Sequence, residues 1–273
     1  NEPISISINI TNDINTSEKD YIQSCPVIAS GHYLLYWETI GVIPDHYIFS
    51  GNAWDHPTHC IVPGGLFYGA CEVCKAHKLN TKFYVLPETK IYLDGGDIPR
   101  SPVHPNLGKN LKPCPVDHRV ESIAINVSEL PSHHGLNIWA KTLTDKFWFN
   151  SGIGTAINLA TVLYPGYNIK LLGNDGGPAG GYFYNRRECD KSLITVMSSE
   201  LTHWASILKP GKLPHYNMNN FNTKHAVKMV EASGGALFNC NKRSYFTVGG
   251  DKYIEDIAAM DNSQLNTSNL FNI

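Results

Sequence analysis

The segment from Phe149 to Asp175 constrains the fold of this chain more than any other part of the sequence. Small residues at 150–152 precede a stretch with helical apolar spacing at 154–163, and an apolar run follows at 169–172. Asp175 then stands in a glycine-rich stretch. A helix that leads directly into a short buried strand is the repeating unit of a parallel sheet, so this segment predicts an α/β fold.

A second unit of the same kind lies upstream, at residues 26–50. A short apolar run predicts a strand that ends in the small-residue turn Ser30-Gly31. Helical apolar spacing follows at 33–40, and residues 46–49 have the composition of another strand. We therefore expect a strand, a turn, a helix and a strand in this order.

The rest of the chain continues the alternation. It predicts a Rossmann-like α/β fold, in which a mostly parallel sheet carries helices on both faces. The 273 residues are expected to form one such domain. Further helices are expected at 63–78, 193–208 and 224–232, and further strands at 82–86, 122–127 and 236–239.

Two segments do not follow this pattern. Residues 1–20 are polar apart from the alternating isoleucines between Ile4 and Ile10, which is typical of an edge strand or an N-terminal arm. Residues 87–118 are rich in proline and glycine and have few periodic apolar positions. We expect them to form an irregular insertion that serves as a lid, an acceptor platform or a dimer contact.

Composition excludes several classes of protein. A hydrophobic content of 42% with 17% charged residues predicts a packed core rather than a disordered chain. The net charge of -2 provides no basic field for a nucleic-acid backbone. The apolar runs are too short to cross a bilayer, so a soluble protein is expected. The 7 cysteines have no regular spacing, which favours the reducing cytoplasm (of the host, for a viral chain) over a disulfide scaffold.

The first candidate site lies where the predicted strands end. In a parallel sheet, the carboxyl ends of the strands and the N-termini of the helices line the same crevice. We expect Ser30, Asn52, Ser151 and Asp175 to converge there. The neighbouring Gly31, Gly152 and Asn174 would let the backbone approach a ligand. Small residues at such turns also serve ordinary helix caps and strand-to-helix packing, so both interpretations stay open.

The stretch after Asp175 adds candidate catalytic groups. Tyr182, Tyr184 and Arg186 stand in a glycine-rich loop, and hydroxyl and guanidinium groups can hold a departing phosphate. Histidine is the side chain best suited to take a proton from a hydroxyl near neutral pH. Among the 12 histidines, His215 in a loop is the first candidate base and His203 the second.

Cysteines and tryptophans offer two further possibilities. Cys71 and Cys74, with Cys60 and His77 nearby, have irregular spacing for zinc and are expected on one helix, so no metal site is assigned to them. The tryptophans could stack on a carbohydrate or pack under the insertion. Both interpretations stay open for Trp54, Trp139 and Trp148.

The order of these motifs resembles a known superfamily. Residues 27–31 (VIASG), 41–49 (GVIPDHYIF), 150–163 and 171–175 (LLGND) are similar to its motifs, and residues 225–244 resemble the unit that closes its domain. It comprises bacterial sialyltransferases of the single-domain Rossmann-like type, flagellin-modifying motility accessory factors and archaeal hydroxymethyl-dihydropterin diphosphokinases. The resemblance touches about half of the chain.

The resemblance implies a glycosyltransferase. Its donor would be a nucleotide sugar, its acceptor a hydroxyl group, and a histidine would act as the base in a direct displacement. No cofactor would be required, although a divalent metal stays open as an alternative. By resemblance, nucleotide and phosphate contacts fall on Ser30, Gly31, Asn52, Ser151, Gly152, Tyr182 and Tyr184, and the base on His215.

Three alternatives remain beside the glycosyltransferase. A magnesium-dependent pyrophosphoryl transferase of the pterin kinase type could use Asp175 with Asp45 as metal ligands. A non-catalytic module could bind carbohydrate through exposed tryptophans. A modified DNA base could serve as the acceptor, although the near-neutral charge disfavours a nucleic-acid partner.

Overall fold

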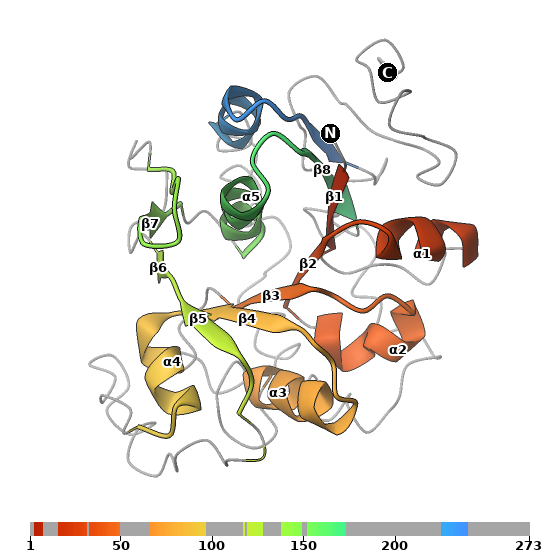
Figure 1. Ribbon diagram of the computed structural model, residues 1–273, viewed down its shortest axis with the longest axis vertical. Coiled ribbons are helices and arrows are strands. Elements are labelled where there is room, and N and C mark those ends of the chain that lie inside the picture. The colour runs from red at the N-terminus through yellow and green to blue at the C-terminus, as the bar shows by residue number, and fades with distance from the viewer. Residues whose placement is uncertain are drawn as a thin grey trace, which may run out of the picture.

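The computed structural model describes residues 3–7, 16–31, 33–49, 66–96, 117, 119–127, 138–148, 152–172 and 225–239. Their centre is a seven-stranded sheet in which all neighbouring strands are parallel (Figure 1). Its strands, in spatial order, are β5 (Ser122–Ala124), β4 (Lys82–Val85), β3 (His46–Phe49), β2 (Val27–Ser30), β1 (Pro3–Ser7), β8 (Asn168–Leu172) and β9 (Leu237–Asn239).

The strand order reverses next to β1. From β1 to β5 the chain moves outward in one direction, strand by strand, and it then returns to place β8 on the free side of β1. Ser7 at the end of β1 is level with Ala29 of β2 and with Leu172, the last residue of β8. The carboxyl ends of these three strands therefore lie at one edge of the sheet, which we call the carboxyl edge.

Strands β2, β3, β4, β8 and β9 send side chains into two separate cores on opposite faces of the sheet. In β2, Val27 and Ala29 belong to one hydrophobic cluster, whereas Ile28 belongs to the other. The same alternation separates Tyr47 from Ile48 in β3. A strand buried on both faces reads as a continuous apolar run rather than as a polar–apolar alternation, and this explains why the short strands are so apolar.

Helices cover both faces of the sheet (Figure 1). The second face is covered by α5 (Gly152–Leu163) and by the helix at 225–232. In α5, every residue from Ile153 to Thr161 is buried, as expected for a helix that crosses the middle of a sheet. The first face carries α1 (Thr16–Gln23), the 3-10 helix η1 (Tyr33–Tyr36), α2 (Trp37–Ile40), α3 (Leu66–Ala76) and α4 (Pro87–Leu93).

The α/β alternation expected from the sequence is confirmed within the described residues. The segments expected at 27–29, 46–49, 82–86, 169–172 and 236–239 correspond to β2, β3, β4, β8 and β9. The segment expected as one strand at 122–127 is two strands, because β6 (Asn126–Val127) leaves the main sheet and pairs in parallel with β7 (Lys146–Phe147). None of the described helices is long and apolar enough to cross a membrane.

The expectation of an edge strand or arm at residues 1–20 is wrong for the part that the structure describes. Strand β1 is central and pairs with both β2 and β8. Residues from Thr16 onward form α1, whose Tyr21 and Ile22 pack on the first core. The sequence of this five-residue strand does not show whether it is central or at an edge, because alternating isoleucines suit both positions.

The expectation of an irregular insertion at 87–118 is wrong at its beginning. Residues Pro87–Leu93 form α4, with proline in the first turn, where its missing N–H leaves no backbone bond unmade. Thr89, Tyr92 and Leu93 are buried at helical spacing and attach α4 to the first core. Residues 97–116 and 118 lie outside the described residues.

Asn158 of α5 fixes the segment 138–148 against the second face. Its side-chain Oδ1 accepts hydrogen bonds from the backbone N–H groups of Ala140 and Trp148, each at 3.0 Å. Its Nδ2 donates to the carbonyl of Ala140 at 2.9 Å.

Trp148, held by this network, is only 2% exposed. Its stacking on a carbohydrate, one of the two interpretations offered above, is therefore ruled out in this fold. Trp139 is half-buried against the same core, and Trp54 lies outside the described residues.

Candidate functional site

The turn after β2 lies at the carboxyl edge and has an unusual backbone. Gly31 has φ +60°, a left-handed conformation that favours glycine. A Cβ atom placed on Gly31 would meet no described heavy atom within 4 Å. Ser30, the preceding residue, is 5% exposed. Among the described residues, no atom thus fills the space beside Gly31, and the turn follows β2, the neighbour of β1 where the strand order reverses.

The N-terminus of α5 points to the same edge. Its other end leads to Tyr164, whose hydroxyl lies 2.6 Å from Nε2 of His46, the first residue of β3. Because His46 marks the amino edge of the sheet, α5 runs antiparallel to the strands. Gly152, at the beginning of α5, is thus at the carboxyl edge, where the positive end of the helix dipole favours an anion.

The turn is attached to the core through Tyr47. The hydroxyl of Tyr47 in β3 donates to the carbonyl oxygen of Gly31 at 2.6 Å. The tyrosine side chain is fully buried, and its ring centroid lies 5.0 Å from that of Phe83 in β4. Strand β3 therefore holds the turn directly, and β4 supports it by packing against the tyrosine ring.

Three of the site residues predicted from the sequence lie within the described residues. Ser30, Gly31 and Gly152 all lie at the carboxyl edge, as expected from the parallel sheet. The other nine are outside the described residues, and their roles stay predictions. They are Asn52, Ser151, Asn174, Asp175, Tyr182, Tyr184, Arg186, His203 and His215.

Asp45 lies at the opposite edge, which removes one proposed metal ligand. It directly precedes β3, and its Oδ2 accepts a hydrogen bond from the backbone N–H of Val27 at 2.8 Å. Val27 begins β2, so the carboxylate is at the amino edge. The suggestion that Asp45 joins Asp175 in a metal site at the carboxyl ends is therefore wrong as far as Asp45 is concerned.

A cluster of aromatic and titratable side chains occupies the amino edge around His46. Its ring lies 5.5 Å from that of Tyr84 and 5.7 Å from that of Tyr164. Burial raises the pKa of Tyr84 to about 12 and also raises the pKa of Tyr164. Burial lowers the pKa of His46, with Asp45 acting in the opposite direction. The hydroxyls of Tyr84 and Tyr164 therefore stay neutral and act as hydrogen-bond donors or acceptors rather than as bases.

Acidification is expected to destabilise the protein through His46 and His225. Burial lowers the pKa of both histidines below the ordinary value of 6.5, and Nδ1 of His46 and Nε2 of His225 are buried without hydrogen-bond partners in the described structure. Below that value the unfolded chain binds more protons than the folded protein. Their contribution to stability is thus complete above pH 6.5 and declines as the pH falls toward the lower folded pKa values.

Urea unfolding at about pH 7.5 and about pH 5.5 would measure this loss. The double variant His46→Gln, His225→Gln is expected to lose less stability on acidification than the unmodified protein, because glutamine does not titrate. An equal loss in the two proteins would assign the pH dependence to other groups.

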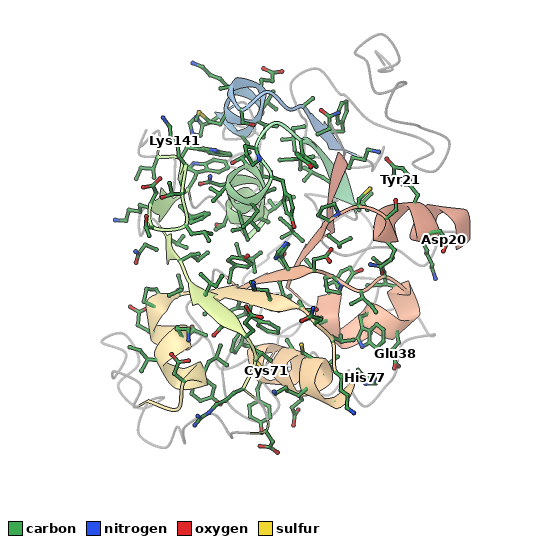
Figure 2. All side chains as sticks on the ribbon, in the orientation of Figure 1. Asp20, Tyr21, Glu38, Cys71, His77 and Lys141 are labelled. Atoms are coloured by element: carbon green, nitrogen blue, oxygen red, sulfur yellow. The ribbon has the colours of Figure 1, made fainter. Side chains whose placement is uncertain are left out.

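The cysteines behave as core residues. Cys71 and Cys74 both lie on α3, as expected, and are buried in the first core. Burial raises the pKa of Cys74, and its thiol donates to the carbonyl of Leu79 at 3.2 Å. His77 instead pairs with Glu38 at 3.3 Å (Figure 2). The described residues contain no group of three or more side chains suited to hold a metal ion.

Sequence reasoning missed two arrangements. Lys170 of β8 is fully buried, donates to the hydroxyl of Tyr21 and lies 4.4 Å from the centre of that ring, which ties α1 to the sheet. The lone lysine in an apolar strand was the available signal. The hydrogen bond from Tyr47 to Gly31 had no signal, because tyrosine is an ordinary strand residue.

No protein-family model matches the chain, and no curated protein or solved structure matches it significantly. The resemblance to sialyltransferases and pterin diphosphokinases therefore remains a prediction that rests on residues alone.

Proposed function

We propose that this chain is a Rossmann-like glycosyltransferase that binds a nucleotide sugar at the carboxyl edge of its sheet. The observation that supports the proposal best is the reversal of strand order between β1 and β8. Ligands of open α/β sheets bind at such reversals, beyond the carboxyl ends of the strands. The uncovered Gly31 turn and the N-terminus of α5 lie at this edge, and both suit a phosphate group.

Chain connectivity supports the same location for several predicted residues. Ser151 directly precedes Gly152, and Asp175 follows soon after Leu172, the end of β8. Consecutive Cα atoms are about 3.8 Å apart, and this short separation in the chain supports including both residues in the proposed site. Asn52 follows the end of β3 at a similar separation in the chain.

The proposed reaction is a direct displacement at the anomeric carbon. The base, His215 with His203 as the alternative, removes the proton from the acceptor hydroxyl. The nucleotide leaves with the electron pair of the bond between the anomeric carbon and its phosphate oxygen. Tyr182, Tyr184 and Arg186 would stabilise the charge that develops on that phosphate. The reaction needs no electron donor and no resident cofactor.

A thermal-shift screen tests this proposal. The protein is heated with CMP, UDP, GDP, ADP, GTP or ATP, each with and without magnesium. A ligand at about 100 times its dissociation constant adds roughly 2.7 kcal/mol to the free energy of unfolding. Stabilisation by one nucleoside mono- or diphosphate without magnesium is expected. Stabilisation only by a triphosphate with magnesium would instead support a pyrophosphoryl transferase, and stabilisation by none would contradict both.

The variant Gly31→Ala is expected to weaken nucleotide binding at least about tenfold, because a methyl group enters the space where the ligand approaches. The left-handed backbone also makes alanine unfavourable by about 1–2 kcal/mol in the folded protein. Isothermal titration with the nucleotide that stabilises the protein, together with urea unfolding, measures both effects.

Gly234→Ala is the matched control for this variant. Gly234 also has positive φ, +92°, and a Cβ there would make only an ordinary contact of 3.7 Å. It precedes β9 and so lies at the amino edge. The control should show a similar loss of stability with unchanged affinity. Equal affinity losses in the two variants would argue against a ligand at the Gly31 turn.

A further inference from the structure

We infer that Tyr47 is a positioning residue of the nucleotide site, because its hydroxyl fixes the Gly31 turn in the orientation that receives the ligand. The inference rests on the proposed function for the identity of the ligand. Tyr47 itself lies in the interior of the protein and reaches the turn from the core. Tyr47 is not expected to touch the nucleotide and acts through the backbone of Gly31.

The geometry makes Tyr47 a rigid support. The side chain is fully buried in the first core, with its ring tilted against Phe83 at 5.0 Å between centroids. A phenylalanine would fill the same core space. What tyrosine adds at the end of the ring is a hydroxyl that reaches Gly31 in the turn after the neighbouring strand. A buried hydroxyl that finds such a partner is retained at little free-energy cost.

Holding the carbonyl of Gly31 also holds the orientation of the peptide unit that follows it, because the peptide unit is planar. The hydrogen bond from Tyr47 holds the oxygen of Gly31 at 2.6 Å. Glycine alone would leave this left-handed turn free to adopt several conformations, since it has no Cβ to restrict φ. A site whose backbone is held before binding loses less conformational entropy on binding, and this raises its affinity.

Tyr33 provides a comparison within the same molecule. It is also fully buried in the first core, and its hydroxyl donates to the carbonyl of Val42 at 2.9 Å. Val42 lies in the connection that leads to β3 at the amino edge. Tyr33 begins η1 two residues after Gly31, but its hydroxyl supports the connection at the amino edge, whereas the hydroxyl of Tyr47 supports the turn at the proposed site.

The test compares Tyr47→Phe with Tyr33→Phe in the full chain. Isothermal titration measures the affinity for each of the six nucleotides of the screen, and hydrogen exchange followed by mass spectrometry measures local opening. Tyr47→Phe is expected to weaken binding roughly five- to tenfold, the effect of one lost hydrogen bond, and to speed exchange around Gly31. Tyr33→Phe is expected to speed exchange around Val42 instead and to leave affinity within about twofold.

The outcomes separate this inference from the proposed function. If the unmodified protein binds a nucleotide and Tyr47→Phe binds it equally well, the inference is overturned and the proposed function stands. Equal losses of affinity in both variants would also overturn it, because the effect would then reflect general packing. If the unmodified protein binds none of the six, the proposed function fails. Exchange around Gly31 then decides: faster exchange in Tyr47→Phe keeps Tyr47 as the support of the turn, and unchanged exchange overturns the inference.

Discussion

Replacing Asn158 by leucine is expected to lower the free energy of unfolding by about 3–5 kcal/mol, the largest loss from any single side chain considered for this protein. Leucine has a similar shape but cannot form hydrogen bonds. The buried N–H groups of Ala140 and Trp148 and the carbonyl of Ala140 would all lose the partner that Asn158 provides. Each unpaired buried group costs about 1–3 kcal/mol, partly offset by relaxation of the loop. Urea unfolding of both proteins measures the difference.

Thr155→Val is the matched control, one turn earlier on the same helix. Thr155 is fully buried and donates a hydrogen bond of 3.2 Å to the carbonyl of Trp148, so it supports the same segment through a longer bond. A loss of about 1 kcal/mol is expected for this variant. A loss below about 1.5 kcal/mol for Asn158→Leu would mean that residues 138–148 do not depend on the amide.

Gly235→Ala is expected to lower the free energy of unfolding by about 3 kcal/mol or more. A Cβ atom at Gly235 would lie 2.0 Å from the carbonyl oxygen of Tyr167 and 2.8 Å from its carbonyl carbon. Both are backbone atoms, and the neighbouring backbone is held by a hydrogen bond from Ile169 to Ala236. The backbone would have to move apart where β9 joins the sheet. Urea unfolding of the variant tests the expectation.

Gly234→Ala, at the adjacent position, separates this clash from the general effect of removing a glycine. Its Cβ would make only an ordinary contact, so backbone strain alone remains, and a loss of about 1–2 kcal/mol is expected. If Gly234→Ala is as destabilising as Gly235→Ala, the close approach to Tyr167 does not determine the stability of this connection.

Much of the fold could be predicted because the residues within each β–α–β unit specify its strands, helix and turns. Residues 46–49 and 169–172 are mostly apolar, short and bounded by turn residues, and they form β3 and β8. The helix at 154–163 could be predicted from small and aliphatic residues at helical spacing, and it is α5. Periodicity reports the conformation of a segment, which is why these elements were found at nearly the right residues.

Position in the sheet could not be predicted in the same manner. The isoleucines at Ile4 and Ile6 specify a strand, but its neighbours are set by contacts with β2 and with the distant β8. Helix α1 was missed because its sequence, TSEKDYIQ, is mostly polar, and its described core contacts come from Tyr21 and Ile22 near its end. Pro87 was interpreted as part of a loop, although at the first helical position it favours α4.

In the candidate site as well, some residues could be placed from the sequence and others could not. Ser30, Gly31 and Gly152 could be placed at one edge because parallel strands end together. Asp45 was misplaced although the predicted strand at 46–49 begins directly after it, which already puts its carboxylate at the amino edge. The support of Gly31 by Tyr47 depends on two strands in register, and no local pattern encodes it.

The central position of β1 also has a consequence for synthesis of the chain. Strands β2 to β5 are synthesised before β8, so we expect β1 to β5 to begin pairing before β8 is available. Until then the β8-facing side of β1 is an open strand edge, able to pair with another nascent chain. Contacts such as Ile4 with Ile169 close it last, since loop closure over so long a separation is slow. We therefore expect the yield of folded protein to depend more on chaperones and on expression temperature than the stability of the finished sheet would indicate.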